Sequence, residues 1–482
     1  MPLANNFKYP ELMRYFETVS SIPRGTYNEK AIADHLVRFA EERGLEYYRD
    51  SFNNVLIKKK ATKGKADRAP LALQGHTDMV CEKNSDVEHD FLRDPIKLYE
   101  ENGWIRARGT TLGADNGVAV AVMLCLLDGG ACEHPPLECL FTASEEVGLD
   151  GAKNFDYSRL TARRMINMDS ADERLITAGC AGGVRTCISL EIGGEPIRNG
   201  YKALGISVGG LFGGHSGEDI GRSRANAIKL LGRVLAYMRK RFSVQLLSLN
   251  GGSKDNAIPR EACATVAIPC ECANDFEKEL FMLEATVRAE LAECDRGFFI
   301  KIKEEAANGN AICSNDTDKV LFLINTAQNG VIAQNTFVEG IVDTSRNLGL
   351  VRTEGEHITC TFLSRSSLES HIDLLVSELD TWGDMLGASV THFNRYPGWS
   401  FAASSDIRRA YISAYEELFG STPEVTVIHA GLECGIISKA VPDMDIVSCG
   451  PVVTDLHSPD EAMDKASFER FFTVIKKIVE TA

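Results

Sequence analysis

The stretch PPLECLFTASEE, Pro135–Glu146, opens on two prolines, continues as an apolar run and ends in two adjacent glutamates. Its length and boundaries predict a buried β-strand, in which the two glutamates would point to opposite faces. Strands and helices alternate around it through about residue 182; the clearest are the helices NEKAIADHLVRFAEERG and NGVAVAVMLCLLDGG and the strands PLALQGHTDMV and RRMINMDS. This alternation predicts an α/β fold with a mainly parallel central sheet flanked by helices.

The pattern changes after residue 183. The segments Ala262–Ile302 and His357–Phe393 each have the order strand, helix, strand, which predicts two similar α+β lobes in residues 184–396. Residues 397–482 return to helices and strands that are expected to complete the first sheet. We therefore predict a discontinuous domain, 1–183 and 397–482, interrupted by an inserted two-lobed domain. A chain of 482 residues is long enough for such an arrangement.

Composition and charge exclude several classes of protein. Hydrophobic residues make up 44% of the chain and charged residues 25%, which is the globular average. The net charge of −16 argues against nucleic-acid and membrane partners, because both require a positive surface. The basic run from Lys58 to Arg68 is the exception, and the glycine in its middle predicts a solvated hairpin turn rather than a binding arm.

The cysteines and the apolar runs predict a cytoplasmic protein. The 14 cysteines are spread singly through apolar segments, without the paired spacing of a disulfide framework or a structural zinc site. The N-terminal segment lacks the charged and apolar regions of a signal peptide. The longest apolar run, Val118–Leu127, is far shorter than the ~20 residues that a membrane-spanning helix needs. A reducing cytoplasm fits these features.

Polar side chains stand at the ends of the predicted α/β segments. His76 and Asp78 end one strand two residues apart, so they share a face of it. Asp115 lies between glycines before a wholly apolar helix, and Asp169 ends another apolar strand. The glutamate pair of the first stretch is a further such feature. Because sites in α/β sheets gather where strands end, this set predicts a metal site.

Each of these residues also has an ordinary structural interpretation. Adjacent glutamates are common on surface helices, an aspartate before a helix usually caps it, and His-x-Asp can be a solvated strand end. The placement of all of them at segment ends favours the metal site. A fifth candidate, His457, lies in the segment that is expected to rejoin the sheet, and His429 in VIHAGLECG is expected near the site.

Six motifs follow one another along the chain: GHTDMV, GTTLGADNG, SEEVGLDGA, NMDS, GGHSG and HAGLECG, with the insertion beginning after the fourth. In this order they resemble the dinuclear zinc peptidases related to aminoacylase and carboxypeptidase G. The resemblance spans essentially the whole chain, and its length and last two motifs are most similar to members that split Xaa-His dipeptides. It implies a discontinuous catalytic domain, an inserted lid domain and two Zn²⁺ per chain.

The resemblance assigns seven residues to a dinuclear centre. Imidazole and carboxylate ligands with a shared water would give each zinc the four-coordination that it prefers. Two metals ~3.5–4 Å apart can lower the pKa of that water and polarise a carbonyl. Such carboxylate-rich sites also accept Mn²⁺ or Co²⁺. The implied roles are His76 and Asp169 on one metal, Glu146 and His457 on the other, Asp115 as the bridge, Glu145 as the general base and Asp78 as the residue that orients His76.

The resemblance also implies substrate-binding residues. His215 in LFGGHSGEDIG becomes an oxyanion stabiliser; a phosphate-binding loop is the competing interpretation, but Gly-Lys-Ser/Thr is missing. Asn256 and Arg365 hold the substrate, with Arg365 on its C-terminal carboxylate, although an exposed ion pair is the ordinary role of such an arginine. Gly431 offers backbone groups. The insertion is large enough to contain both His215 and Arg365, so both are expected to act within one chain.

The sequence therefore predicts a metallodipeptidase for unblocked dipeptides, of the Xaa-His type and including β-alanyl-histidine, as a monomer or homodimer. Other hydrolases of the same clan remain alternatives, namely an N-acyl amino acid deacylase or a tripeptidase. A phosphoesterase with two metals is chemically conceivable. A non-catalytic metal- or peptide-binding protein is the most distant alternative, because Glu145 would have no purpose there.

Overall fold

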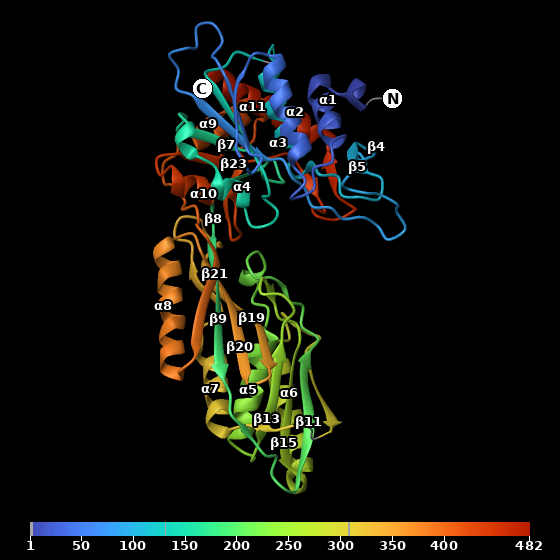
Figure 1. Cartoon of the computed structure of the whole chain (residues 1–482), viewed down its shortest axis with the longest axis vertical. Coiled ribbons are helices and arrows are strands. Elements are labelled where there is room, and N and C mark those ends of the chain that lie inside the picture. The colour runs from blue at the N-terminus through green and yellow to red at the C-terminus, as the bar shows by residue number, and fades with distance from the viewer. Residues whose placement is uncertain (1–2, 131, 307–308) are drawn as a thin grey trace. The chain divides into compact units, whose positions relative to one another are not determined.

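The computed structural model describes residues 3–130, 132–306 and 309–482. The chain forms two compact units (Figure 1). The first comprises Met1–Cys180, Trp399–Val427 and Leu432–Ala482, and the second comprises Ala181–Gly398 and Ile428–Gly431. Each unit has a hydrophobic core of its own.

The first unit is built on an eight-stranded mixed sheet with the order β1-β2-β6-β3-β7-β23-β8-β22. Its centre is parallel: β6, β3, β7 and β23 run in the same direction, whereas β1 and β2 are antiparallel to their neighbours. The strands of this sheet are β1 (Glu46–Arg49), β2 (Val55–Lys59), β3 (Leu71–His76), β6 (Leu137–Thr142), β7 (Arg164–Asn167), β8 (Leu175–Cys180), β22 (Glu424–Ile428) and β23 (Asp445–Ser448).

A smaller four-stranded sheet of the first unit has the order β24-β25-β5-β4. Its strands are β4 (Leu98–Glu101), β5 (Trp104–Ala107), β24 (Val453–Thr454) and β25 (Ala462–Asp464). The α-helices of the unit are α1 (Pro10–Ser20), α2 (Lys30–Glu42), α3 (Ala114–Asp128), α4 (Asp150–Asn154), α9 (Asp406–Phe419), α10 (Glu433–Ala440) and α11 (Lys465–Thr481).

The central strands and the helix α3 owe their burial to their composition. β3 and β6 are buried at every position, as expected for parallel strands covered on both faces. Helix α3 is apolar all round and contacts both β3 and α1, so it lies inside the unit rather than on its surface. The segment after the insertion supplies β23 to the parallel centre, as the sequence predicts. The predicted α/β fold class is confirmed.

The glutamate pair lies outside the strand that precedes it. Strand β6 ends at Thr142, and Ser144 has a left-handed φ of 52°, so the chain turns before Glu145. The expectation that the two glutamates are neighbours in a strand is therefore wrong.

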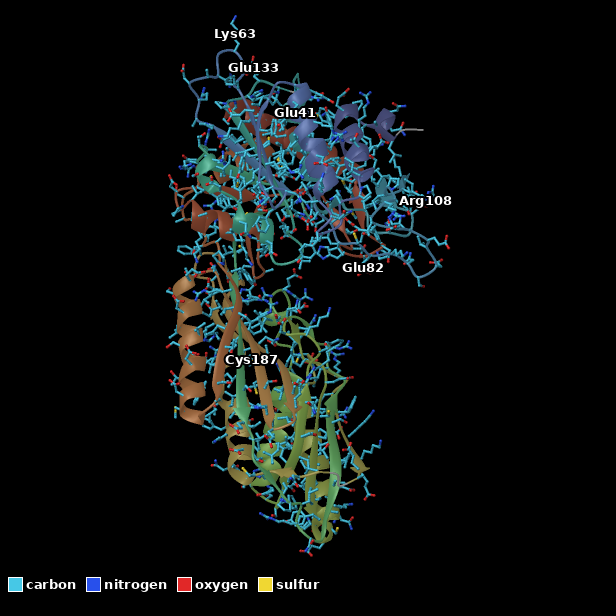
Figure 2. The ribbon with its side chains drawn as sticks, viewed as in Figure 1. Glu41, Lys63, Glu82, Arg108, Glu133 and Cys187 are labelled. Atoms are coloured by element: carbon cyan, nitrogen blue, oxygen red, sulfur yellow. The ribbon has the colours of Figure 1, made fainter. Side chains whose placement is uncertain are left out.

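The basic run from Lys58 to Arg68 is not a hairpin turn. It connects β2 to β3, and β6 lies between these two strands in the sheet. The prediction is wrong because β6, which comes much later in the sequence, pairs with both of them. The run is nevertheless solvated, and Lys63 extends away from the fold in Figure 2.

The second unit contains a nine-stranded sheet, in which the order β16-β11-β15-β13-β19-β20-β9-β21 is joined by β18 at β19. Its strands are β9 (Gly182–Glu191), β11 (Tyr201–Gly209), β13 (Gln245–Gly251), β15 (Ala262–Pro269), β16 (Phe299–Glu305), β18 (Gly330–Gln334), β19 (Val342–Glu354), β20 (His357–Ser366) and β21 (Ser389–Tyr396). Short pairs are β10 (Gly194–Glu195) with β17 (Ala311–Ile312) and β12 (Gly214–His215) with β14 (Ala257–Ile258).

One face of this sheet packs against helices. Burial alternates along β9, where Cys187 lies on the less buried face, and the buried positions join the core formed with the helices. The helices are α5 (Ala227–Arg239), α6 (Ala273–Glu290), α7 (Ser314–Thr326) and α8 (Glu369–Leu386). Both segments predicted as strand, helix, strand have that order, as β15-α6-β16 and β20-α8-β21, and all four strands belong to the one sheet.

Two predictions from composition can be compared with the structure. All 14 cysteines are free thiols, in keeping with the absence of a disulfide pattern. Within residues 3–130, 132–306 and 309–482, no helix combines the length and the apolar character that crossing a membrane requires.

Candidate metal centre and substrate-binding residues

Three candidate ligands come from one edge of the central sheet of the first unit. His76 is the last residue of β3, Asp169 follows the end of β7, and Glu146 lies in the turn after β6. These three strands are parallel neighbours, so their carboxyl ends meet at the same edge. The sheet topology therefore brings together residues that are far apart in the sequence.

The Asp115 carboxylate lies between two histidines. Its Oδ1 is 2.9 Å from His76 Nε2, and its Oδ2 is 3.2 Å from His457 Nε2. The same nitrogen of His76 is 3.5 Å from Asp169 Oδ1, and that of His457 is 3.2 Å from Glu146 Oε2. Each oxygen of Asp115 thus faces its own imidazole–carboxylate pair, which is the arrangement that a bridging carboxylate needs.

Asp115 does not cap helix α3. Gly113 precedes the helix with a left-handed φ of 68°, and Asp115 and Asn116 have non-helical backbone angles at its start. The carboxylate of Asp115 is turned instead toward the two histidines. The ordinary interpretation of an aspartate before a helix does not apply here.

The donor set fits divalent metal ions. His76, Asp115 and Glu146 each offer a ligand atom, and these atoms lie within 4.8 Å of one another. Among the described residues, the buried atom Glu146 Oε1 has no hydrogen-bond partner. Imidazole and carboxylate groups are the usual nitrogen and oxygen ligands of zinc, and carboxylate oxygens also suit manganese.

Both histidines lie in a negative field. Burial lowers the pKa of His76, but Asp169 and Asp115 outweigh it, and the resulting pKa is well above the usual value. Hydrogen bonds to Asp115 and Glu146 raise the pKa of His457 to about 10. A field that favours a positive imidazole also favours a bound metal cation.

Asp78 lies behind His76 and the glutamate turn. Its Oδ1 is 3.4 Å from His76 Nδ1, on the side of the ring opposite the other carboxylates. Its two oxygens accept hydrogen bonds from the backbone N–H groups of Glu145, at 3.0 Å, and Glu146, at 3.3 Å. A carboxylate in this position fixes the orientation and tautomer of a ligating histidine. Asp78 therefore links the end of β3 to the turn that carries both glutamates.

Glu145 is the candidate for proton transfer. Burial raises its pKa well above the usual range, and Asp169 and Glu433 act in the same direction. A carboxyl with a raised pKa can accept a proton near neutral pH and release it again.

The remaining candidates lie in the second unit. Arg365, on β20, is 5% exposed and donates from Nη1 to the hydroxyl of Tyr396 at 2.7 Å. Its neighbour in the β19–β20 register is Ser345, whose hydroxyl is 2.7 Å from His429 Nε2. His215 Nδ1 accepts a hydrogen bond from the backbone N–H of Glu218 at 3.2 Å. His429 thus lies beside Ser345, the strand neighbour of the candidate residue Arg365.

His215 and His429 have lowered pKa values. Burial is the main cause for both, and the positive charge of Arg365 acts in the same direction. The pKa of His429 falls to about 3. Both imidazoles are therefore mainly neutral at pH 7. A guanidinium beside neutral donors suits an anionic group.

Asn256 and Gly431 adjoin these side chains. The carbonyl of Asn256 accepts a hydrogen bond at 2.9 Å from the N–H of Ser216, the residue after His215. A Cβ at Gly431 would lie 2.8 Å from a ring carbon of Tyr396, so the close approach of the ring requires glycine there. The second unit thus gathers all four of its predicted residues around the loops of His215 and His429.

Comparisons with known proteins decide the family. The model described as Peptidase family M20/M25/M40 matches residues 72–481. The chain belongs to this family. The Escherichia coli (strain K12) protein named cytosol non-specific dipeptidase is 38% identical to the peptidase over 465 residues, 96% of each chain. The solved structure of aminoacylhistidine dipeptidase from Vibrio alginolyticus has a TM-score of 0.94 at 36% identity and covers 99% of the peptidase and 98% of its own chain.

More distant structures share the fold alone. Aminopeptidase PepT from Bacillus cereus has a TM-score of 0.56 at 16% identity, over 98% of the peptidase and 97% of its own chain. The comparisons confirm the predicted class, a hydrolase acting on peptide bonds in a family of metallopeptidases. The predicted similarity to aminoacyl-histidine dipeptidase is also confirmed.

Sequence analysis missed Glu461, which organises the loop of Asp115 in the peptidase. The Glu461 side chain is almost fully buried and accepts hydrogen bonds from the backbone N–H groups of Leu112, at 2.7 Å, Gly113, at 2.9 Å, and Asp115, at 3.3 Å. The sequence signal was its place in HSPDE, four residues after His457. Nothing in that spacing shows that the partners are backbone groups of a distant loop.

A second missed residue is Glu433, which lies within the motif HAGLECG. Its carboxylate is fully buried and accepts hydrogen bonds from Gln74 Nε2, at 2.6 Å, and Thr142 Oγ1, at 2.7 Å. Burial raises its pKa to about 7. Since Gln74 and Thr142 lie on β3 and β6, Glu433 supports the strand ends that carry the candidate ligands.

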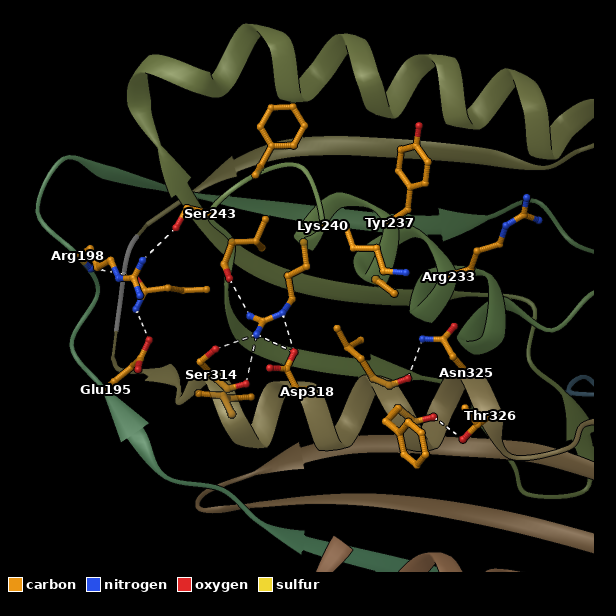
Figure 3. A pocket seen from close by; sticks show the side chains of 18 residues that line it. Glu195, Arg198, Arg233, Tyr237, Lys240, Ser243, Ser314, Asp318, Asn325 and Thr326 are labelled. Carbon is orange, nitrogen blue, oxygen red and sulfur yellow. Dashed lines mark hydrogen bonds and ion pairs between the residues drawn. The ribbon is translucent and has the colours of Figure 1, made fainter. Parts of the chain in front are cut away.

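One large cavity in the described part of the peptidase lies away from these residues. It measures about 810 Å³ and lies between α5 and α7 of the second unit (Figure 3). Its cations are partly engaged: Arg239 pairs with Asp318 at 2.8 Å, and Arg233 makes two contacts to Glu290 at 2.6 and 2.8 Å. The hollow beside Asp115 measures only about 60 Å³. We place the site at Asp115 because the ligand chemistry is there.

Proposed function

We propose that this peptidase is a cytoplasmic dipeptidase with two divalent metal ions, and that it hydrolyses unblocked Xaa-His dipeptides, including β-alanyl-histidine. The observation that carries the proposal is the Asp115 carboxylate, whose two oxygens face separate imidazole–carboxylate pairs. The name of the Escherichia coli relative supports dipeptides as substrates, and the name of the Vibrio alginolyticus structure supports the Xaa-His type. The word cytosol in one name supports the compartment.

In this proposal the first unit is the catalytic domain and the second unit is the lid. The lid then comprises Ala181–Gly398 and Ile428–Gly431. The four residues that return to it contain His429 and Gly431. The catalytic domain keeps every candidate metal ligand.

The candidate ligands divide into two sets that share Asp115. His76 and Asp169 would hold one ion, and Glu146 and His457 the other. Bound there, the two ions would lower the pKa of a shared water and polarise the substrate carbonyl. Zn²⁺ fits the imidazole and carboxylate donors, and Mn²⁺ or Co²⁺ are chemically acceptable substitutes.

Glu145 is the proposed general base, and Asp78 the residue that orients His76. The carboxylate of Glu145 takes a proton from the attacking water and then gives it to the leaving amine nitrogen as the peptide bond breaks. Its raised pKa supports this role, because a carboxylate with a higher pKa accepts a proton from water more readily.

The residues of the second unit are proposed to bind the substrate. Arg365 grips the C-terminal carboxylate, for which a guanidinium fork is well shaped. His215 stabilises the oxyanion: because its Nδ1 accepts a hydrogen bond, its proton lies on Nε2, which can donate to the substrate. Asn256 and the backbone of Gly431 hold the remaining polar groups of the dipeptide.

A substrate panel tests the proposal. The protein reconstituted with Zn²⁺ is expected to hydrolyse Xaa-His dipeptides faster than tripeptides or N-acetyl amino acids. Preference for an N-acetyl amino acid or a tripeptide would replace the dipeptidase by a deacylase or a tripeptidase. Turnover of a phosphate ester but no peptide would indicate a phosphoesterase, and bound metal without any turnover would indicate a binding protein.

We also propose that His215 and Arg365 serve the active site of their own chain, whether the peptidase is a monomer or a homodimer. An inactive His215→Ala chain mixed with an inactive Glu145→Gln chain should then recover no activity. Substantial recovery would show that the residues act across a dimer.

A further inference from the structure

The segment RGTYNE, Arg24–Glu29, contacts each of the loops that carry the catalytic glutamate turn, Asp78 and Asp115. It precedes residues 72–481, which match the family model. Three of its polar side chains, Arg24, Thr26 and Glu29, hydrogen-bond within the first unit; Arg24 is 1% exposed and Glu29 is 3% exposed.

Arg24 links two loops through backbone carbonyls. Its Nη1 donates to Thr77 O at 3.0 Å and to Asp78 O at 2.9 Å, and its Nη2 donates to Gly113 O. No carboxylate forms an ion pair with it among the described residues. One planar guanidinium therefore sets the spacing between the end of β3 and the loop of Asp115.

The glycines around Asp115 make room for this guanidinium. A Cβ at Gly113 would lie 2.6 Å from Arg24 Nη2, and a Cβ at Gly117 would lie 2.8 Å from it. The spacing of glycines in TLGADNG is thus explained by a side chain from the N-terminal segment. An alanine at either position would displace Arg24.

Thr26 adds a second contact to Asp78, and Glu29 reaches the glutamate turn. Thr26 Oγ1 donates to Asp78 Oδ2 at 3.0 Å. Glu29 Oε1 accepts hydrogen bonds from the N–H of Tyr27, at 2.9 Å, and from the N–H and hydroxyl of Ser144, at 3.0 and 2.8 Å. Ser144 immediately precedes Glu145, so Glu29 holds the start of the turn that carries the glutamate pair.

The positive charge of Arg24 lies in the field of nearby carboxylates. Burial lowers its pKa, and Glu461, Asp78 and Asp115 oppose this shift. A fully buried guanidinium is costly, and here it is balanced by hydrogen bonds to carbonyls and by the field of the carboxylates. Arg24 therefore adds one fixed positive charge beneath a region that gathers negative ones.

We propose that Arg24, Thr26 and Glu29 are positioning residues of the metal centre. They hold Asp78, the Asp115 loop and the glutamate turn at the spacing that two metal ions require, and they touch neither metal nor substrate. This inference rests on the metal centre proposed above.

The test measures Zn²⁺ affinity without substrate, by competition with a chromophoric chelator, for Arg24→Met, Thr26→Val and Glu29→Gln. Loss of groups that orient ligands typically weakens metal binding about 10- to 100-fold. We expect Arg24→Met to weaken Zn²⁺ binding about tenfold or more, and Thr26→Val and Glu29→Gln to weaken it less. At limiting Zn²⁺, kcat should fall while KM changes little, and excess Zn²⁺ should restore kcat in Thr26→Val and Glu29→Gln.

Two matched variants control for loss of stability alone. Arg346 is also fully buried and donates to Leu375 O and to Glu378, but it lies in the second unit. Glu138 is 3% exposed and accepts hydrogen bonds from the backbone of Thr161 and Ala162, away from the ligands. Arg346→Met and Glu138→Gln should lower the melting temperature and leave Zn²⁺ affinity unchanged.

The inference is overturned if Arg24→Met binds Zn²⁺ like the wild type while it loses stability as Arg346→Met does. If Arg24→Met does not fold, the milder Thr26→Val decides, and unchanged affinity and kcat in a folded Thr26→Val would overturn the proposal. A wild-type protein that binds no Zn²⁺ would overturn the metal centre itself, which is a different result from equal binding by all variants.

Discussion

The two units of the peptidase hold histidines of opposite electrostatic character. In the first unit, carboxylates raise the pKa of His76 and of His457, the latter to about 10. In the second unit, burial and Arg365 lower the pKa of His215 and of His429, the latter to about 3. The same side chain is thus prepared for metal cations in one unit and for anionic groups in the other.

A dipeptide requires both kinds of environment. Its C-terminal carboxylate needs a cationic partner, and its peptide carbonyl needs strong polarisation before water can attack it. The first unit supplies carboxylates at the edge of a parallel sheet, and the second supplies a buried arginine with neutral imidazoles. In our account, recognition of the substrate and the chemical step are assigned to different units.

The largest effect is expected from Glu145→Gln, which removes the proposed base from the first unit. The amide has almost the same shape but cannot accept the proton, so kcat should fall by about 10²- to 10⁴-fold while Zn²⁺ remains bound. Steady-state kinetics and metal analysis check both parts. The exposed Glu82→Gln is the control, and substantial turnover by Glu145→Gln would remove this residue from the mechanism.

The next effect concerns Arg365, the proposed anion-binding residue of the second unit. Arg365→Met should lower kcat/KM for a free dipeptide by about 100-fold, because a charge-assisted hydrogen bond is lost. The corresponding dipeptide amide should be affected little, since it has no carboxylate. Arg395→Met, on exposed β21, is the control. An equal loss for the acid and the amide would show that Arg365 has another role.

A smaller effect is expected from Tyr396→Phe. The tyrosine hydroxyl accepts the hydrogen bond from Arg365 Nη1, and its ring packs against the Gly431 backbone. Phenylalanine keeps the ring and removes one hydrogen bond, so KM should rise by about 5- to 10-fold with kcat nearly unchanged. A fall in kcat at constant KM would place Tyr396 in the chemical step instead.

The last effect is on stability, and it follows from the pKa of His429. This pKa is about 3 in the folded protein against 6.5 for the free side chain, so the unfolded chain takes up the proton first on acidification. This contribution to the free energy of unfolding is complete above pH 6.5 and is lost progressively as the pH falls from 6.5 toward 3. His429→Gln should therefore weaken the fall of the melting temperature between pH 7 and pH 5.

A control for this measurement is the exposed His357→Gln. It should leave the pH dependence of the melting temperature as in the wild type. Parallel profiles for wild type and His429→Gln between pH 7 and 5 would contradict the burial of a neutral imidazole.

The sequence predicted the ligand residues better than what surrounds them. His76 and Asp169 are candidates because each follows or ends an apolar strand, and parallel strands bring such ends to one edge; Asp115 is a candidate because it precedes an apolar helix. The turn of the glutamate pair was missed because the apolar run continues past Thr142, where strand β6 already ends.

The supporting residues could not be predicted from local pattern. Glu461, Glu433 and Arg24 bind backbone or side-chain groups that are far away in the sequence, so nothing in their own segments reveals the contact. The glycines beside Asp115 looked like turn residues, and the structure shows that they accommodate Arg24. Such reasons appear only when the three-dimensional neighbours are known.

The most direct test is anomalous diffraction from crystals of the peptidase loaded with Zn²⁺. The account predicts two peaks on either side of Asp115, one next to His76 and Asp169 and the other next to His457 and Glu146, and none at His215 or His429. A single peak that does not involve Asp115, or a metal bound by the histidines of the second unit, would contradict the division of roles between the two units.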